Sequence, residues 1–267
     1  MPNLRRILSR AVARGIAEGN ALARAFAAPR TGLRVLMYHS VGSAATGDTQ
    51  SLYGIAPELF ARHMAALAAL ARQQTLQIVA LGEGLSATAA TRIAVTFDDG
   101  YRDNLHCAAP ILAQHAIPFT VFVCSGFLDG TPDNCLSTAE LRELGALPGV
   151  TIGAHGATHT PLTQLDDPAL RHELAASKAR LEDILGRAVT ALSYPHGAVN
   201  RRVRDAAAAA GYTLGASSRF DINAAGRDPL LLCRTDIHGG DSLRVFKQKL
   251  HGDWDWYRSR SVDPAAS

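Results

Sequence analysis

The chain has 267 residues, 47% of them hydrophobic, and a net charge of +3 at pH 7. This length and apolar content are enough for one catalytic domain with a substantial core. The small net charge and the 6% aromatic content argue against a dedicated nucleic-acid binder, which needs a concentrated basic face or a row of stacking rings.

Residues 1–29 are expected to form a basic amphipathic helix ahead of the main domain. Met1–Ala28 starts with Arg5 and Arg6 and ends in a cleavage-like Ala-Phe-Ala-Ala-Pro, but charged residues interrupt the apolar core that a secretory signal needs. No stretch of the chain approaches the ~20 apolar residues of a membrane span. Apolar residues recur at helical spacing opposite the arginines, namely Leu4, Ile7, Leu8, Ala11, Val12 and Ile16. Two interpretations remain: the helix packs on the main domain or frays, or it attaches peripherally to an anionic membrane surface.

The main domain, residues 30–258, alternates between apolar strands and helices, and residues 259–267 are expected to be a loose tail. Strands are predicted at residues 33–38, 92–97, 119–124, 150–154, 189–194, 212–216 and 230–237. Helices are predicted to begin at Pro57, Asp103, Ser137, Asp167, Asn200 and Asp241. Strict alternation with crossover helices predicts parallel strands, and about seven strand–helix units at this length favour closure into a barrel.

The four cysteines are widely separated and form no Cys-x-x-Cys pair. Free thiols in a reducing compartment are the simplest interpretation, and a bridge between Cys124 and Cys135 stays open. Together with the N-terminal helix, this predicts a cytoplasmic protein, either free or at the inner face of the membrane.

Two adjacent carboxylates, Asp98 and Asp99, follow the strand at residues 92–97, and Gly100 allows a sharp turn after them. In α/β folds the carboxyl ends of strands face the crevice where ligands bind. Because neighbouring buried carboxylates repel each other, either solvent or a cation must compensate them. An Asp-Asp-Gly turn with a helix-capping role is the alternative interpretation.

His155 and His159 follow the strand at residues 150–154 with four-residue spacing. Two imidazoles and one carboxylate form the ligand set of open zinc and iron sites, which leave positions for water and substrate. That these two strand ends meet in space is itself a prediction, because the spacing alone does not show it.

Three segments resemble the successive motifs of the polysaccharide deacetylase family, also called the NodB-homology domain or carbohydrate esterase family 4: residues 96–101, residues 152–155 with His159, and residues 194–197. The resemblance covers about Leu33 to Leu250, and its first two motifs together are specific. It implies a distorted (β/α)7 barrel that removes acetyl groups from N-acetylated sugars. The strand end at residues 35–39 resembles the subgroup that acts on poly-N-acetylglucosamine and related exopolysaccharides.

The resemblance implies that Asp99, His155 and His159 bind one divalent metal ion, Zn²⁺ by default and Co²⁺, Ni²⁺ or Fe²⁺ otherwise. It also implies that Asp98 is the general base. The chemistry agrees, because a cation lowers the pKa of bound water from 15.7 towards ~7 and polarises the carbonyl of a resistant amide, while the neighbouring carboxylate takes the proton. The third motif, with Tyr194, Pro195 and His196, corresponds to the family's oxyanion and substrate site, where a backbone N–H near His196 is the expected donor.

Two departures from the family pattern concern the base and the acid. The third motif commonly has an arginine before the proline and a tyrosine after it, where this chain has Ser193 and His196. Some other group of this chain must therefore orient the base. For the general acid, the subgroup resemblance favours His39 over His238, which lies nearest the position of a late Leu-x-His motif, and His196 is a third candidate.

The leading hypothesis is a metal-dependent de-N-acetylase acting on a bacterial glycan or on its lipid-linked precursor. One alternative is a glycan-binding pseudoenzyme that keeps the barrel but not turnover, although the complete ligand set argues against it. Another is a hydrolase of a non-carbohydrate amide or an O-acetyl ester. No nucleic-acid partner is expected.

Overall fold

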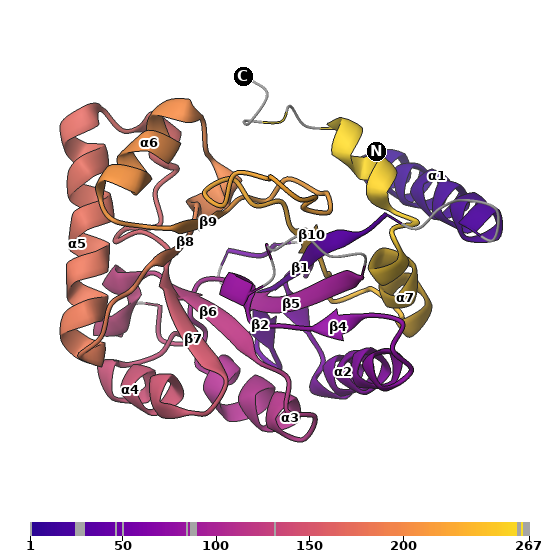
Figure 1. Cartoon of the computed structure of the whole chain (residues 1–267), viewed down its shortest axis with the longest axis horizontal. Coiled ribbons are helices and arrows are strands. Elements are labelled where there is room, and N and C mark those ends of the chain that lie inside the picture. The colour runs from indigo at the N-terminus through magenta and orange to yellow at the C-terminus, as the bar shows by residue number, and fades with distance from the viewer. Residues whose placement is uncertain are drawn as a thin grey trace.

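The computed structural model describes a parallel sheet surrounded by helices (Figure 1), over residues 2–24, 30–45, 47–49, 51–83, 85, 90–130, 132–260 and 263. The sheet follows the order β10-β1-β5-β6-β7-β8-β9, and β4 pairs with β5 beside this path. Its strands are β1 (Gly32–Tyr38), β4 (Gln77–Ile78), β5 (Thr91–Phe97), β6 (Phe119–Val123), β7 (Val150–Ala154), β8 (Ala191–Ser193), β9 (Leu214–Ala216) and β10 (Thr235–Asp236). The short strands β2 (Ser40–Val41) and β3 (Gly54–Ile55) pair separately.

Residues 229–236 connect the two ends of the sheet. The first part of this segment lies along β9, where Leu232 N donates to Gly215 O and Ser217 N donates to Leu232 O, both at 2.8 Å. Its last part is β10, which pairs with β1 in parallel. The predicted strand at residues 230–237 therefore bonds first to one neighbour and then to the other. The distorted (β/α) barrel predicted from the sequence is confirmed.

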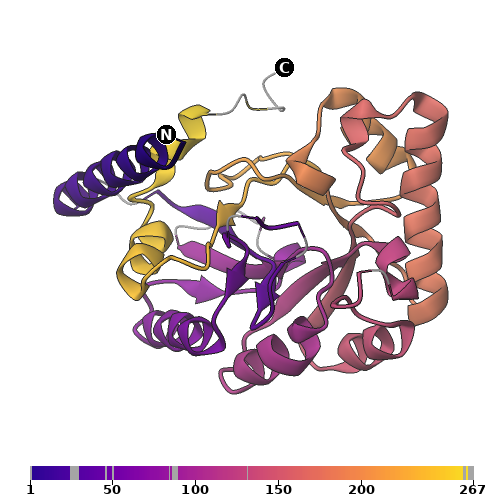
Figure 2. The same cartoon turned by 180° about the vertical axis from the view of Figure 1, so that it is seen from behind.

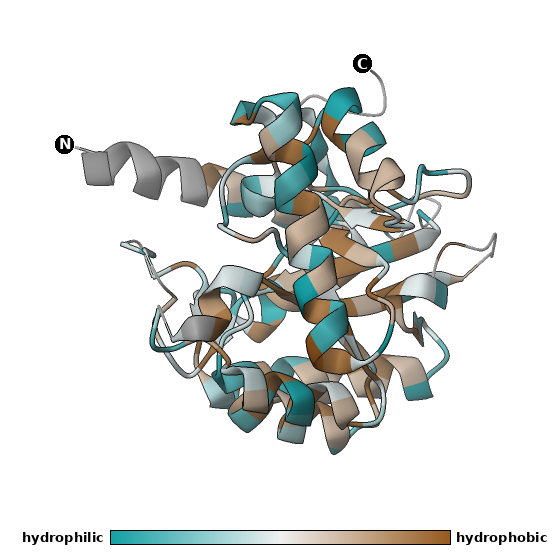
Figure 3. Ribbon diagram, turned by 90° about the vertical axis from the view of Figure 1, so that its left-hand side faces the viewer, coloured by the Kyte–Doolittle hydropathy of each residue, from teal (hydrophilic) through white to brown (hydrophobic). Residues whose placement is uncertain are grey.

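Helices cover the outside of the sheet (Figures 1 and 2). In Figure 3 the strands behind the helices are largely brown, while the helices alternate between teal and brown, as expected where one helix face packs on the core. The helices are α1 (Pro2–Ala23), α2 (Pro57–Arg72), α3 (Ala109–Ala113), α4 (Thr138–Ala146), α5 (Asp167–Leu185), α6 (Arg201–Ala209) and α7 (Leu243–His251).

Several helix ends agree with their sequence signals. Ser137 and Glu140 form the predicted reciprocal capping box of α4. Gly186 ends α5 in the left-handed conformation, with φ of 64°. The helix predicted from Asp103 is present, but its first part is a π-helical turn (Asn104–Ala108) that continues directly into the short α3. The Asp103 carboxylate does not cap this turn, because it accepts hydrogen bonds from Ser40 and Ser43 instead.

Helix α1 lies at the edge of the molecule beside α7 and the C-terminal turn (Figures 1 and 2). It packs through Ala13 and Ala17 against a cluster that includes Phe220, Val245 and Trp254. Its larger apolar side chains face outward: Val12 is 61% exposed, Ile16 39% and Leu22 79%. Among the described helices, none has the length and hydropathy needed to cross a bilayer.

Candidate metal centre and active site

The carboxyl ends of the strands carry the predicted site residues, as expected for a parallel barrel. Asp98 and Asp99 follow β5, and His155 and His159 follow β7. Asp99 has φ of 70° and Gly100 has φ of 77°, which turns the chain sharply after the strand. A Cβ at Gly100 would lie 3.1 Å from the Val123 side chain, so this turn requires glycine on two grounds.

Asp99, His155 and His159 meet as one cluster, which confirms that the two strand ends come together. Asp99 Oδ1 lies 3.3 Å from His155 Nε2 and 3.2 Å from His159 Nε2. All three prospective ligand atoms lie within 4.8 Å of one another. Burial raises the pKa of Asp99, but its contacts with the two imidazoles outweigh burial and hold the pKa well below its usual range.

These residues fit a divalent cation. The Nδ1–H of His155 donates to the Ser193 carbonyl at 2.8 Å, because a carbonyl can only accept. The Nε2 lone pair is thereby directed at Asp99, as in the outer contacts that orient metal-binding histidines. Asp99 Oδ1 is buried without a directed hydrogen bond among the residues described, as expected of an oxygen reserved for a ligand.

Asp98 is held by an arginine that the sequence motifs did not predict. Arg234 Nη1 donates to Asp98 Oδ1 and Arg234 Nη2 to Asp98 Oδ2, both at 2.7 Å. The Ser193 hydroxyl donates to Asp98 Oδ2 at 3.1 Å. Burial raises the pKa of Asp98, but the Arg234 guanidinium, followed by His155, brings it below its ordinary value. The carboxylate is therefore ionised at neutral pH although it is only 3% exposed.

Arg234 makes the contact to Asp98 that the sequence analysis expected from an arginine in the third motif. Its Nε donates to Ser217 O at 2.8 Å, and the side chain is fully buried. Arg234 Nη2 also donates to the Ser193 hydroxyl at 2.9 Å, so the small serine both admits and binds the guanidinium. One signal could have identified it: an arginine between Cys233 and Thr235 in an apolar strand requires a buried acid as partner.

Two of the candidate acids, His39 and His238, lie near Tyr53. His39 follows β1, and its Nδ1 is buried with no hydrogen-bond partner among the described residues. Its ring lies 4.4 Å from the ring of Tyr53, which in turn lies 6.2 Å from the ring of His238. Burial, followed by the charge of Lys249, lowers the pKa of His238. Sequence analysis missed Tyr53, because nothing local marks a loop tyrosine as part of a site.

In the third motif, His196 lies beside the metal cluster, whereas Tyr194 and Pro195 are buried. His196 adopts φ of 57°, and its ring lies 4.6 Å from that of His159. Tyr194 is fully buried, and its hydroxyl donates to Leu230 O at 2.8 Å on the segment that closes the barrel. Pro195 is buried at the start of the turn Pro195–Gly197. The oxyanion and substrate roles of all three residues stay predictions.

Residues 86–215 match the family model described as polysaccharide deacetylase. Over this segment, just under half of its length, the chain resembles polysaccharide deacetylases. Among curated proteins, the chain is similar to the putative polysaccharide deacetylase YxkH of Bacillus subtilis (strain 168), with 30% identity over 136 residues, or 51% of this chain and 47% of that protein. It is also similar to a chitooligosaccharide deacetylase of Rhizobium leguminosarum bv. trifolii, with 36% identity over 85 residues, or 31% of this chain and 35% of that protein. The chain therefore spans about half, or less, of the length of these curated relatives.

Solved structures share the fold of this chain. The Streptococcus pyogenes deacetylase PplD superposes with a TM-score of 0.72 at 23% identity, over 84% of this chain and 99% of that one. IcaB from Ammonifex degensii superposes with a TM-score of 0.69 at 22% identity, over 83% and 98% of the two chains. These likenesses confirm the barrel architecture.

Proposed function

We propose that the chain is a metal-dependent hydrolase that removes N-acetyl groups from an N-acetylated bacterial glycan. The observation that carries the proposal is the ionised Asp98, held by buried Arg234 directly beside the Asp99, His155 and His159 cluster. The family match and the likeness to a chitooligosaccharide deacetylase support the same reaction class.

The three clustered residues would hold the cation, which would supply Lewis acidity at the acetyl carbonyl and activation of water. Asp98 is placed to accept the proton of that water. Each carboxylate oxygen offers about two acceptor positions, and Asp98 Oδ1 spends one of them on Arg234. One acceptor position on an oriented, ionised oxygen therefore remains for the proton.

We assign the general acid to His39. Breaking the amide requires a proton at the sugar nitrogen, and an imidazole supplies one near neutral pH. His39 is among the groups that lower the pKa of Asp99, and this electrostatic effect supports the assignment. His238 is the weaker donor, because burial lowers its pKa and so reduces its protonated fraction.

The substrate we propose is a glycan of the poly-N-acetylglucosamine type or its lipid-linked precursor. Its support is the β1 end, residues 35–39, which resembles the exopolysaccharide subgroup. Zn²⁺ is the metal we propose, because an imidazole–carboxylate set with an open position suits it, as it also suits Co²⁺, Ni²⁺ and Fe²⁺.

The test measures acetate release from poly-N-acetylglucosamine oligomers, chitooligosaccharides and an O-acetylated xylan, with and without chelator, alongside the metal content of the protein. Chelator-sensitive release from N-acetylated sugars is expected. Release only from the O-acetyl ester would change the substrate class. Glycan binding without any release from metal-loaded protein would show a binding module instead.

A further inference from the structure

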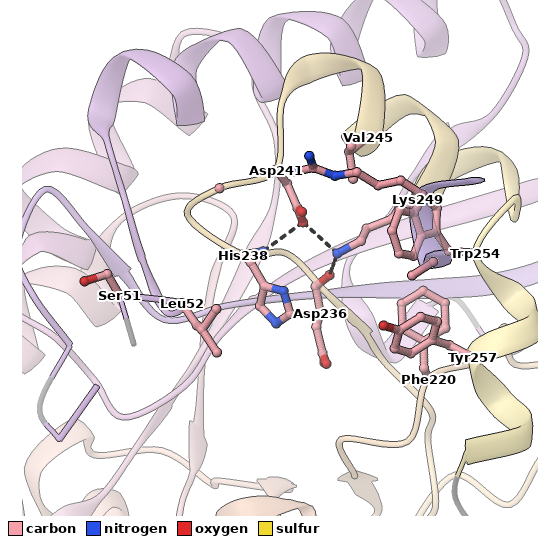
Figure 4. Close-up of a pocket in the computed structure, with 13 residues that line it drawn as sticks. Ser51, Leu52, Phe220, Asp236, His238, Asp241, Val245, Lys249, Trp254 and Tyr257 are labelled. Carbon is pink, nitrogen blue, oxygen red and sulfur yellow. Dashed lines mark hydrogen bonds and ion pairs between the residues drawn. The ribbon is translucent and has the colours of Figure 1, made fainter. Parts of the chain in front are cut away.

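A second cavity lies beside His238, outside the metal cluster. It has a volume of about 220 Å³ and lies between the loop that follows β10, helix α7, the C-terminal turn and the middle of α1 (Figure 4). The rings of His39, Tyr53 and His238 follow one another from the metal centre to this cavity. A glycan bound for reaction at the cluster could therefore extend past Tyr53 into it.

Among the described residues around the cavity, one carboxylate oxygen has no hydrogen-bond partner. Lys249 Nζ donates to Asp241 Oδ2 and to the Asp236 carbonyl, both at 2.6 Å. Asp241 Oδ2 also accepts from His238 N at 2.9 Å. Asp236 Oδ1, by contrast, is buried and has no hydrogen-bond partner among the residues described. A buried anionic oxygen without a donor is costly, which makes it a strong acceptor for a bound cation.

The cavity presents this carboxylate beside an aromatic wall. Figure 4 shows the Asp236 carboxylate pointing away from the Lys249–Asp241 pair, toward the space between His238 and the rings of Phe220 and Tyr257. Phe220 and Tyr257 lie with ring centroids 5.8 Å apart. An aromatic wall beside a carboxylate oxygen that has no donor offers both the apolar and the polar contacts usual in a small-molecule site.

An amino sugar has the chemistry that this cavity matches. The apolar face of its ring suits the aromatic wall, and its ammonium group offers the charge and the donors that Asp236 lacks. An acetamido group offers one N–H and no charge, so it would leave the carboxylate uncompensated. Deacetylation itself converts acetamido sugars into amino sugars on the same chain.

We propose that this cavity binds an already deacetylated 2-amino sugar of the glycan while a neighbouring acetylated sugar reacts at the metal centre. The inference rests on the proposed function and assigns Asp236 as the residue that distinguishes amino from acetamido sugars. Arg14, exposed on α1, also lines the cavity.

The experiment compares glucosamine trimer with N-acetylglucosamine trimer by calorimetry on the metal-loaded full chain. The native protein is expected to bind the glucosamine trimer roughly 10- to 100-fold more tightly, as for one charged hydrogen-bonded contact. Asp236→Asn, which keeps the side-chain shape, is expected to lose this preference. Asp183→Asn, the same change at an exposed position of α5, is the matched control and is expected to keep it.

The binding result and the reaction result separate the two proposals. Equal affinity of the native protein for both trimers, or an unchanged preference in a folded Asp236→Asn protein, would overturn the amino-sugar site even if acetate is released. Absence of acetate release from every glycan would overturn the proposed function. The binding preference would still test whether the cavity binds amino sugars. Mass spectrometry of partly deacetylated hexamers should show new amino groups next to existing ones in the native protein and scattered ones in Asp236→Asn.

Discussion

At the scale of single residues, the two adjacent aspartates differ in their partners. Asp99 faces two imidazoles, whereas Asp98 is bound by a guanidinium and a hydroxyl. Asp98→Asn should therefore retain metal and lose activity by about 10²- to 10⁴-fold, because an amide cannot accept the proton. Asp99→Asn should lose metal affinity, with His172→Asn on the exposed face of α5 as the control. Metal content and acetate release, measured on the same samples, decide the matter: a metal-free Asp98→Asn protein would exchange the two roles.

Arg234 makes the activity of Asp98 dependent on pH in a predictable direction. Without the guanidinium, burial would dominate and raise the pKa of Asp98. Since the base must be ionised, Arg234→Gln should move the acid limb of the kcat/KM profile to higher pH. The unfolding free energy should also fall, by about 3–5 kcal/mol, because one partner of a buried pair is lost. An acid limb that stays in place would show that Arg234 is structural only.

The general acid is tested by the opposite limb of the profile. An acid must be protonated, so the rate falls as the pH rises through its pKa. His39→Ala should remove this alkaline limb and most of kcat at unchanged metal content, whereas His238→Ala should preserve the limb. A bell-shaped profile and a near-native rate in His39→Ala would transfer the role to His238.

The sequence was sufficient for residues with a local pattern and insufficient for those brought in from a distance. Adjacent aspartates after a strand and two histidines at fixed spacing can be recognised in the sequence. Arg234 does not, because its partner lies 136 positions away and is reached only when the barrel closes. Tyr53 was not predicted for the same reason, because it is brought next to His39 only by the path of a loop.

At the scale of elements, caps with a complete side-chain signal were predictable. The box of Ser137 and Glu140 needs only four consecutive residues, and α4 begins where it predicts. Asp103 also had the signal of a cap, but Ser40 and Ser43 compete for its carboxylate from another strand end. Local propensity therefore failed where a tertiary hydrogen bond was available.

The α4 cap should give stability a definite pH dependence. Burial raises the pKa of Glu140, but hydrogen bonds from the backbone and hydroxyl of Ser137, then from His106 and Arg102, lower it to about 2. The unfolded carboxyl, with an ordinary pKa of 4.5, takes up its proton first as the pH falls. The contribution of Glu140 is therefore complete above pH 4.5 and lost towards pH 2. Glu140→Gln should lower the unfolding free energy by about 0.5–2 kcal/mol at pH 7, and the difference in urea denaturation should shrink at pH 3; a difference independent of pH would contradict this.

At the scale of the whole molecule, α1 exposes apolar side chains within a part of the sequence that is rich in arginine. Residues 1–24 contain five arginines and one glutamate, and residues 243–260 contain five basic and two acidic residues, so the remainder of the chain is net negative. We expect binding to phosphatidylserine-containing vesicles that weakens with salt, at about 1 kcal/mol per arginine near the surface.

Two variants separate the apolar and electrostatic parts of this binding. Changing Val12, Ile16 and Leu22 to serine should abolish co-sedimentation with vesicles, and so should changing Arg5, Arg6, Arg10 and Arg14 to glutamate. Ala11→Ser with Ala23→Ser, both exposed on the same helix, is the matched control. Partitioning that is equal for all four proteins would leave α1 as a helix that only packs on the barrel.

The closing segment at residues 229–236 also determines when the site becomes complete during synthesis. β1 and β5 can pair once 97 residues have been made, and the aspartates and both histidines have all emerged by residue 159. The counter-charge of Asp98 arrives only with residue 234, and β1 gains its second neighbour only with residue 235. A nascent chain can thus assemble its metal ligands long before its base is oriented. We therefore expect hydrolysis to begin only after β10 has paired with β1, so that acetate release by a nascent chain would report closure of the barrel.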